Sequence, residues 1–313
     1  MKKLTVGVIG CGYFGKFHAD KYSRIPETNL IGVVDPVLGR AEEVARKNQT
    51  TAYADSSDLY DKVEAVSIAV PTKLHYSVAR EFLQRGIHVL IEKPIASQTA
   101  EAEELVRLAH ERNVVFQVGH LERFNPALRA LDDTLTAPRF IESHRLQSFV
   151  ERALDVDVIM DLMIHDIDVI LSLVRSDVTE IRATGVPILS TTIDIANARI
   201  SFANKCVANV TASRVSLKTM RKVRIFQPDA YLSIDFAERM VAIYRKMPGP
   251  PGSSFPQITA QQIKPPEYDA LQVEVQAFID AVQGKVPVLV TGEDGLKALK
   301  VAKEIIRQIS ESV

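Results

Sequence analysis

Cysteine is scarce in this 313-residue sequence, which contains only Cys11 and Cys206. Two cysteines cannot form the disulfide framework that holds small secreted domains together. An excess of one charge is also lacking, since the formal net charge is −1, and no global field draws the protein to nucleic acid or to a membrane. No apolar run is long enough to cross a bilayer, and Lys2 and Lys3 are not followed by a signal-peptide core. These absences predict a cytoplasmic protein with reduced thiols that binds neither nucleic acid nor membrane.

The alternation of strands and helices in the first third predicts a nucleotide-binding fold. Hydrophobic residues make up 46% and charged residues 25% of the chain, which is ordinary for a large-cored globular protein of about two domains. Buried strands are expected at residues 5–9, 30–35, 65–70, 87–91 and 114–118. Helices are expected from residue 16 and at 39–48, 75–85 and 99–112. Repeated βα units of this kind predict a parallel doubly wound sheet in a first domain, residues 1–121.

The pattern changes after residue 121, where a second domain of residues 122–313 is expected. Residues 153–175 are predicted to form one helical block. Seven strands are predicted around it, at residues 139–150, 178–188, 193–202, 205–215, 221–226, 230–235 and 239–246. Several alternate apolar and polar residues, which predicts an open, largely antiparallel sheet whose exposed face a second subunit could cover. A loop is expected at residues 247–266, and helices at 271–283 and 292–309. The fold class is therefore α/β in both domains.

A glycine motif joins the first predicted strand to the first helix. Gly10 permits a tight turn, Gly12 lets a pyrophosphate approach the backbone, and Gly15 allows close packing of helix on strand. Asp35 ends the next strand, 20 residues after Gly15, where a carboxylate would bind the ribose hydroxyls. That acid would repel a 2′-phosphate, so the pattern favours NAD over NADP. The alternative is a plain glycine turn with Asp35 as a loop residue.

Two further segments carry groups suited to acid–base chemistry. Lys93 follows a predicted strand, where a lysine could relay the proton of a reacting hydroxyl; taken alone, it is more often a solvated loop residue. At helical spacing Asp157, Asp161, His165 and Asp168 share one stripe of an otherwise apolar helix. A carboxylate that orients an imidazole is a general-base arrangement, but a satisfied core histidine is also possible. A metal site is disfavoured because no second histidine lies nearby.

Four motifs resemble the Gfo/Idh/MocA oxidoreductase family across essentially the whole chain. They are Gly10-Cys11-Gly12-Tyr13-Phe14-Gly15 with His18, then Asp35, Glu92-Lys93-Pro94 and Asp161-x-x-x-His165. The resemblance implies a Rossmann domain, then an α/β domain that pairs subunits into a homodimer or homotetramer. It implies Lys93, Asp161 and His165 as catalytic residues in NAD-dependent oxidation of a sugar or cyclitol carbinol, and a cis bond before Pro94. The cofactor residues that it implies are Gly10, Gly12, Tyr13, Phe14, Gly15, Asp35, Pro71, Thr72, His75, Glu92 and Lys93.

A narrower resemblance concerns the substrate. Residues 119–126 (GHLERFNP) and 161–168 are similar to a subgroup that includes UDP-N-acetylglucosamine 3-dehydrogenases. This implies a nucleotide sugar oxidised at C3, with Arg123, Asn125 and His165 at the substrate. The basic residues that could meet its diphosphate are Arg123 and the run Arg214, Lys218, Arg221, Lys222 and Arg224; that run could equally be a solvated strand.

Two other functions stay open. The chain could oxidise a free sugar or a myo-inositol-type substrate, or it could be a non-catalytic NAD sensor. A sensor needs only the glycine loop and Asp35, so the intact Lys93, Asp161 and His165 argue against it. The choice of base between Lys93 and His165 is also left open by the sequence.

Overall fold

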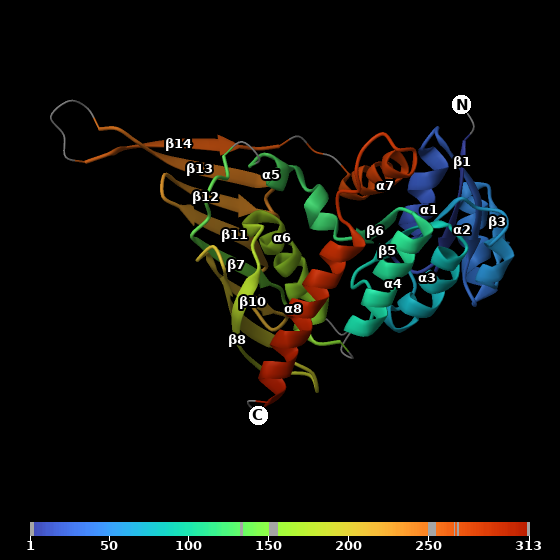
Figure 1. Ribbon diagram of the computed structural model, residues 1–313, viewed down its shortest axis with the longest axis horizontal. Coiled ribbons are helices and arrows are strands. Elements are labelled where there is room, and N and C mark those ends of the chain that lie inside the picture. The colour runs from blue at the N-terminus through green and yellow to red at the C-terminus, as the bar shows by residue number, and fades with distance from the viewer. Residues whose placement is uncertain are drawn as a thin grey trace. The chain divides into compact units, whose positions relative to one another are not determined.

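The computed structural model describes residues 3–131, 134–149, 156–249, 255–265, 267 and 269–311. The chain forms two compact units. One unit is Met1–Phe124 together with Asp269–Leu299, and the other is Asn125–Tyr268 together with Lys300–Val313. Both combine a β-sheet with helices (Figure 1), so the predicted α/β class is confirmed for each.

The first unit is built on a six-stranded parallel sheet. In spatial order its strands are β3 (Thr51–Tyr53), β2 (Thr28–Val34), β1 (Leu4–Ile9), β4 (Ala65–Ile68), β5 (His88–Glu92) and β6 (Phe116–Gly119). The helices are α1 (Gly15–Arg24), α2 (Leu38–Asn48), α3 (His75–Gln84) and α4 (Thr99–Arg112). Strand order reverses between β1 and β4, and ligands bind such folds at the carboxyl ends of the strands beside that switch. The predicted doubly wound sheet is therefore confirmed, and β3 is a short strand that was not predicted.

Local sequence explains where these elements stop and start. Val6 and Val8 in β1 are fully buried, as expected for a central parallel strand covered on both faces. Helix α4 begins with a capping box in which Gln98 and Glu101 satisfy each other's backbone N–H groups, and it ends at Asn113 in the left-handed conformation. The short 3₁₀ turns η1 (Ser56–Leu59), η2 (Thr72–Leu74) and η3 (Leu121–Phe124) complete the unit.

The first unit also includes a segment from near the C-terminus, Asp269–Leu299. Helix α7 (Ala270–Val282) packs against α1 and η3, and its Val275, Phe278 and Ile279 belong to the same apolar core as Val6 and Val8. The predicted division put all of residues 122–313 in one domain. In the structure, residues 269–299 instead lie with the first unit, because the apolar face of α7 is buried against the Rossmann core.

The second unit is built on an eight-stranded sheet. In spatial order its strands are β14 (Gln257–Ile263), β13 (Met240–Met247), β12 (Ala230–Asp235), β11 (Met220–Gln227), β7 (Phe140–Leu146), β10 (Val207–Ser213), β9 (Ile195–Phe202) and β8 (Val178–Val186). Only the β7–β10 pair is parallel among these described strands. All seven predicted strands are present, so the largely antiparallel sheet is confirmed.

One face of this sheet is covered by α6 (Ile164–Val174), which contacts β7 and β10. Along β7, Ile141, Ser143 and Arg145 are buried, whereas the alternate residues are partly exposed. The short helix α5 (Pro126–Arg129) contacts β12. The final helix, α8 (Gly292–Glu311), begins among first-unit residues and ends among second-unit residues.

Two predictions of local structure need correction. The loop expected at 247–266 contains β14, which pairs with β13 from Val241↔Ile263 to Met247↔Gln257. Its sequence is QITAQQI, in which the two isoleucines are five positions apart, so the strand lacks the apolar alternation that would have revealed it. The helical block expected at 153–175 begins as a π-helix, η4 (Ile159–Met163), and only then becomes α6. Of the two predicted segments, residues 153–155, 250–254 and 266 lie outside the described residues. No helix in the described ranges combines the length and hydropathy needed to span a lipid bilayer.

Candidate functional site

The glycine loop between β1 and α1 has the geometry of a phosphate-binding turn. Gly10 has a φ of +95°, and a Cβ there would lie 2.5 Å from the Ala69 carbonyl oxygen. A Cβ on Gly15 would lie 1.7 Å from the Gly10 carbonyl oxygen, so no side chain fits at either position. At Gly12, by contrast, a Cβ would meet none of the described atoms within 4 Å. The loop is thus closed by two glycines and open at the third, where a pyrophosphate needs close access to the backbone.

Asp35 directly follows β2, and backbone groups fix its carboxylate. Oδ2 accepts the Cys11 N–H at 3.0 Å and Oδ1 accepts the Val37 N–H at 2.9 Å. The residue is 5% exposed. Each oxygen keeps a second lone pair, so a carboxylate held in this orientation fits the paired hydroxyls of an adenosine ribose. These residues therefore fit NAD, with the rings of Tyr13 and Phe14 exposed beside the loop.

Pro71, Thr72 and His75 lie in the connection that follows β4. Pro71 precedes η2, and His75 opens α3. The His75 ring is buried, with Nδ1 2.8 Å from the Pro94 carbonyl and Nε2 2.9 Å from the Val70 carbonyl. Burial lowers the pKa of His75, against the opposing effect of these two hydrogen bonds. His75 therefore links the loop that follows β4, at Val70, to the loop that follows β5, at Pro94.

Lys93 follows β5, and the chain around it is tightly held. The Lys93–Pro94 peptide bond is cis, as predicted. Ile95 and Ala96, just beyond, are fully buried, and the Pro94 carbonyl is bonded to His75. On the other side, the Glu92 carboxylate lies 3.0 Å from Nε2 of His18 on α1. A lysine between two anchored neighbours has a fixed backbone from which to direct its ammonium group.

His120 is a polar residue at the same sheet edge that was not predicted as a site residue. It follows β6, and β5 and β6 pair Glu92 with Gly119 immediately before it. The ring is 1% exposed, and neither ring nitrogen has a hydrogen-bond partner in the described structure. Burial, and then the charges of Lys93 and Arg123, lower the pKa of His120 to about 3. A neutral imidazole therefore lies beside Lys93; its position directly after a strand end was the only sequence signal.

The other predicted catalytic residues lie in the second unit. Asp161 is in the π-helix η4 and His165 is in the first turn of α6, and both side chains are partly buried. Asp157 does not continue the predicted stripe as a helical residue, because it precedes the helix and accepts the Met160 N–H at 2.9 Å. Burial raises its pKa. Asp161 therefore precedes His165 by four positions on the same helical segment, and the π-helix ends and α6 begins between them.

The predicted substrate residues have different surroundings. Arg123, in η3, donates Nη2 to the Leu289 carbonyl at 3.3 Å, and Asn125 caps α5 by accepting the Ala127 N–H at 3.0 Å. The prediction that Arg214 binds a diphosphate is wrong, because its side chain is 3% exposed and its guanidinium is paired with the Asp194 carboxylate at 2.7 Å. Arg224 is paired with Glu142 at 2.8 Å.

The chain is similar to known proteins along nearly its whole length. Residues 4–120 match the family model described as "Oxidoreductase family, NAD-binding Rossmann fold", and residues 131–230 match the "GFO/IDH/MocA C-terminal domain". The chain is 39% identical over 310 residues to UDP-N-acetylglucosamine 3-dehydrogenase of Acidithiobacillus ferrooxidans, which covers 97% of each chain. A solved structure of that protein matches with a TM-score of 0.92, covering 99% of this chain and 98% of that one.

More distant relatives act on other substrates. The scyllo-inositol 2-dehydrogenase (NAD(+)) of Bacillus subtilis is 28% identical over 236 residues, 68% of each chain. The scyllo-inositol dehydrogenase of Lactobacillus casei, solved with NAD(H) and scyllo-inositol, matches with a TM-score of 0.82 at 21% identity over 99% of this chain and 98% of that one. At that identity the second match shows the shared fold.

Proposed function

The chain belongs to the Gfo/Idh/MocA family of NAD-binding oxidoreductases, and we propose that it oxidises a nucleotide sugar of the UDP-N-acetylglucosamine type at C3. The observation that carries the substrate is the 39% identity to a UDP-N-acetylglucosamine 3-dehydrogenase over 97% of both chains. NAD is the cofactor, and when bound it accepts hydride on its nicotinamide ring. The chain itself must bind the sugar, orient its hydroxyl and remove the proton.

We assign the proton transfer to two candidate bases, Lys93 and His165. Lys93 has the fixed backbone described above, at the carboxyl edge of the sheet where the cofactor binds. His165 has a carboxylate, Asp161, four residues before it on the same helical segment, an arrangement that can orient an imidazole. Residues 1–121 would hold NAD, and residues of the predicted second domain, 122–313, would hold the sugar, apart from 269–299, which lie with the first unit. The buried thiols of Cys11 and Cys206 support the proposal that the enzyme works in the reducing cytoplasm.

A second candidate function is oxidation of a free inositol-type polyol. It is favoured by the 28% identity to scyllo-inositol 2-dehydrogenase over 68% of the chain. The two candidates differ in whether the substrate carries a diphosphate, and the residue that we propose as its contact is Arg123, through its guanidinium group. Arg123 is partly exposed. Its charge and that of Lys93 both lower the pKa of His120, so the two cations lie near the same imidazole.

Inhibition by UDP should separate the two candidates. We expect UDP alone to compete with the substrate and Arg123→Ala to raise KM about 10- to 100-fold with kcat nearly unchanged, since a charged hydrogen bond contributes about 1.5–3 kcal/mol and a uniform binding contact affects KM. Initial rates of NAD reduction, measured with nucleotide sugars and with free polyols, provide the test.

The matched control is Arg112→Ala, which removes an exposed arginine from the end of α4. Its KM should stay at the wild-type value. Rapid turnover of a free polyol, together with no inhibition by UDP, would replace the nucleotide-sugar proposal with the polyol one.

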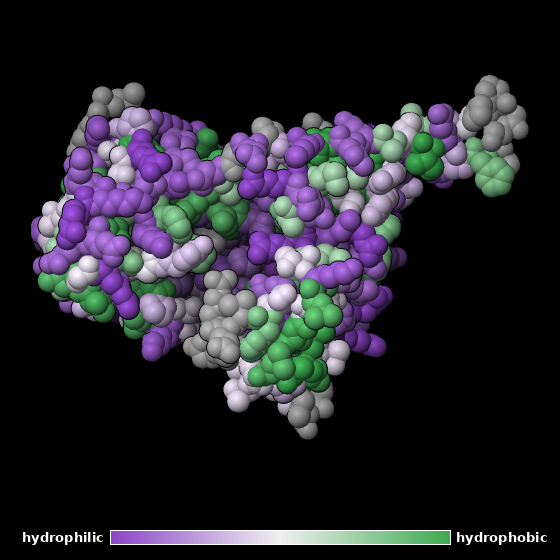
Figure 2. Space-filling model, turned by 180° about the vertical axis from the view of Figure 1, so that it is seen from behind, coloured by the Kyte–Doolittle hydropathy of each residue, from purple (hydrophilic) through white to green (hydrophobic). Residues whose placement is uncertain are grey.

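We also propose that the open face of the second sheet joins two copies of the chain. Four aromatic side chains cross this face in register on neighbouring strands, with ring centroids 4.9–5.7 Å apart: Phe140, Phe226, Tyr231 and Tyr244. Beyond them, β13 and β14 extend as an arm (Figures 1 and 2). The arm exposes Met247, Phe255 and Ile258. An apolar row with an exposed apolar arm is suited to a two-fold interface.

Light scattering at micromolar concentration should therefore give a dimer or a tetramer. Tyr231→Lys places a charge in the middle of the aromatic row and should shift the mass toward the monomer, because an unpaired charge is costly in an apolar interface. Tyr76→Lys, on α3 of the first unit, makes the same chemical change outside the row and should leave the mass unchanged. A monomeric wild-type protein would contradict the proposal.

A further inference from the structure

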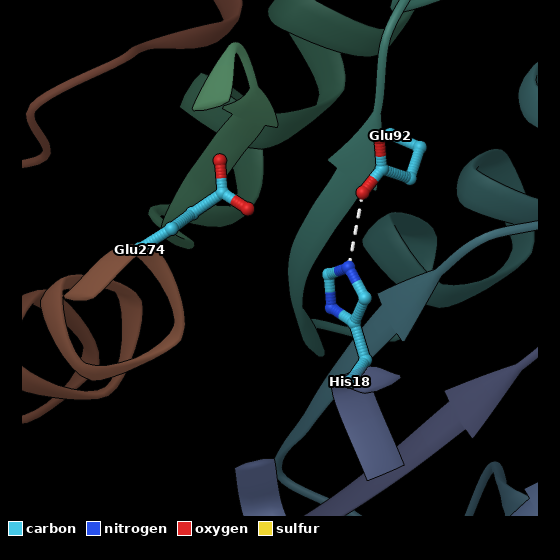
Figure 3. Close-up of side chains that lie close together, drawn as sticks. All are labelled: His18, Glu92 and Glu274. Carbon is cyan, nitrogen blue, oxygen red and sulfur yellow. Dashed lines mark hydrogen bonds and ion pairs between the residues drawn. The ribbon is translucent and has the colours of Figure 1, made fainter. Parts of the chain in front are cut away.

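Glu274 is a buried acid in the first unit that the proposed chemistry does not use. It lies on α7 and is 1% exposed. Neither carboxyl oxygen has a hydrogen-bond partner in the described structure. Figure 3 shows its side chain reaching from α7 toward the side of the unit that carries His18 and Glu92. Glu274, His18 and Glu92 each have one side-chain oxygen or nitrogen atom within 4.8 Å of such an atom of the other two. An ionised carboxylate in such a position has lost its hydration without replacement.

The neighbours of Glu274 are short of hydrogen-bond donors. Glu92 is an acceptor already bonded to His18 Nε2 at 3.0 Å, and the other ring nitrogen of His18 lies 3.1 Å from Ser67 Oγ. The hydroxyl of Tyr22 is 2.7 Å from the same Ser67. The donors on α1 are thus occupied, and two acidic side chains face one another with no cation paired to Glu274 in the described ranges.

A second acceptor on β6 points to the same shortage. Gln117 donates its Nε2 to the backbone carbonyl of Glu274 at 3.2 Å, and its own Oε1 has no partner in the described structure. A carboxylate at position 274 would add two more acceptors to this group. A carboxylic acid would instead supply the missing donor.

We propose that Glu274 is a neutral carboxylic acid, so that the Glu92–Glu274 pair holds one proton and a single negative charge. That charge resides on Glu92, where it holds His18 and fixes the residue before Lys93. The titratable groups that face Glu274 from neighbouring elements are His18 and Tyr22 on α1 and Glu92 at the end of β5. Burial and the charge of Glu92 both raise the pKa of Glu274 above its usual range, in agreement with the geometric argument.

A divalent cation is the competing explanation for the same three side chains. A cation would need Nε2 of His18 as a ligand, whereas that nitrogen already lies at hydrogen-bond distance from Glu92. A shared proton keeps this bond intact, which is why the geometry favours the proton.

The proposal predicts a specific pH dependence of stability. Between about pH 4.5, where a glutamate in the unfolded chain titrates, and the higher pKa of the folded state, only the folded protein keeps this proton. The wild type therefore loses stability as pH rises through this window. Glu274→Gln is neutral at every pH and nearly the same shape. The ratio of the wild-type to the Glu274→Gln unfolding constant should rise about tenfold per pH unit from pH 5 until the pH reaches the folded-state pKa of Glu274, and should level off above it.

Urea denaturation of the full-length protein across pH 5–8, with Glu42→Gln as control, measures this ratio; Glu42 is an exposed glutamate on α2 of the same unit. Infrared spectra at pH 7 should in addition show a protonated-carboxyl carbonyl band in the wild type that is missing in Glu274→Gln. A constant ratio with no such band would overturn the proposal. A stoichiometric metal in the purified wild type that Glu274→Gln loses would also overturn it. Both readouts are independent of the proposed substrate and reaction.

Discussion

Lys93→Ala and His165→Ala should each lower kcat by about 10²–10⁴-fold, the loss expected when a positioned acid–base group is removed. The dissociation constant of NAD should change little, because neither side chain is needed at the glycine loop or at Asp35, which hold the adenosine half. Stopped-flow or steady-state rates of NAD reduction give kcat, and fluorescence titration gives the NAD affinity. A loss in both quantities would instead indicate that the variant disturbs the cofactor site.

The controls make the same substitutions at positions away from the sheet edge. Lys62→Ala removes a lysine that lies over the Tyr53 ring, and His110→Ala removes an exposed histidine on α4. Both should retain wild-type kcat. If Lys93→Ala and His165→Ala behave like these controls, the catalytic assignment is wrong and the Asp161–His165 segment has a structural role.

The pH profile of the two variants should then identify the base. The acidic limb of kcat/KM reports the group that must lose a proton, so that limb should disappear in the variant that lacks the base. The other variant should have a lower kcat/KM at every pH, but its profile should still show the acidic limb. This comparison needs no assumption about which residue is responsible, which the sequence alone left open.

Features set by short-range sequence were predicted well. The strand, glycine turn and helix at residues 5–22 are contiguous, and the spacing from Gly15 to Asp35 is fixed by one βα unit, so the cofactor loop follows from local pattern. The positive φ of Gly10 and the 1.7 Å approach to Gly15 explain why these positions are glycine. The same holds for α4, whose capping residues Gln98 and Glu101 lie within one turn.

Features set by distant partners could not be predicted. Glu274 is separated from Glu92 by 182 residues of chain (274 − 92) and meets it only because α7 returns to the Rossmann core. In the sequence it is one of 39 acidic residues, indistinguishable from those on the surface. The strand β14 was missed for a related reason, since its pairing with β13 rather than its own pattern makes it a strand.

The fate of Arg214 shows how a charge pattern can mislead. In the sequence, Arg214 opens a basic run, a pattern that fits either a diphosphate contact or a solvated strand. In the structure, Asp194 Oδ1 accepts its Nε–H at 2.7 Å, and its Nη atoms donate to the Val156 carbonyl, Ser190 Oγ and Thr192 Oγ1. Both ends of the ion pair are buried, at 3% and 0% exposure. Arg214 thus holds strand β10's end to the turn that follows β8.

Asp194 depends on this guanidinium, although backbone groups assist. Its Oδ2 accepts the N–H groups of Ile188, Leu189 and Ser190 at 2.6–2.9 Å. Burial raises the pKa of Asp194, but the hydrogen bonds from Ser190, Ile188 and Arg214 outweigh it and the pKa is lowered overall. An acid with a lowered folded-state pKa contributes stability above about pH 4 and loses it only as pH falls toward that pKa. At neutral pH the full contribution is present.

Arg214→Met should therefore reduce the free energy of unfolding by about 3–5 kcal/mol at pH 7, the cost of leaving a buried charge without its partner. Arg221→Met, an exposed member of the same basic run, should change it by less than about 0.5 kcal/mol. Urea denaturation followed by circular dichroism measures both. A stable Arg214→Met variant with a raised KM for the nucleotide sugar would show that the arginine binds substrate after all. If the arginine serves only the buried ion pair, Arg214→Met should unfold at a lower urea concentration than the wild type, while the KM of its folded fraction stays unchanged.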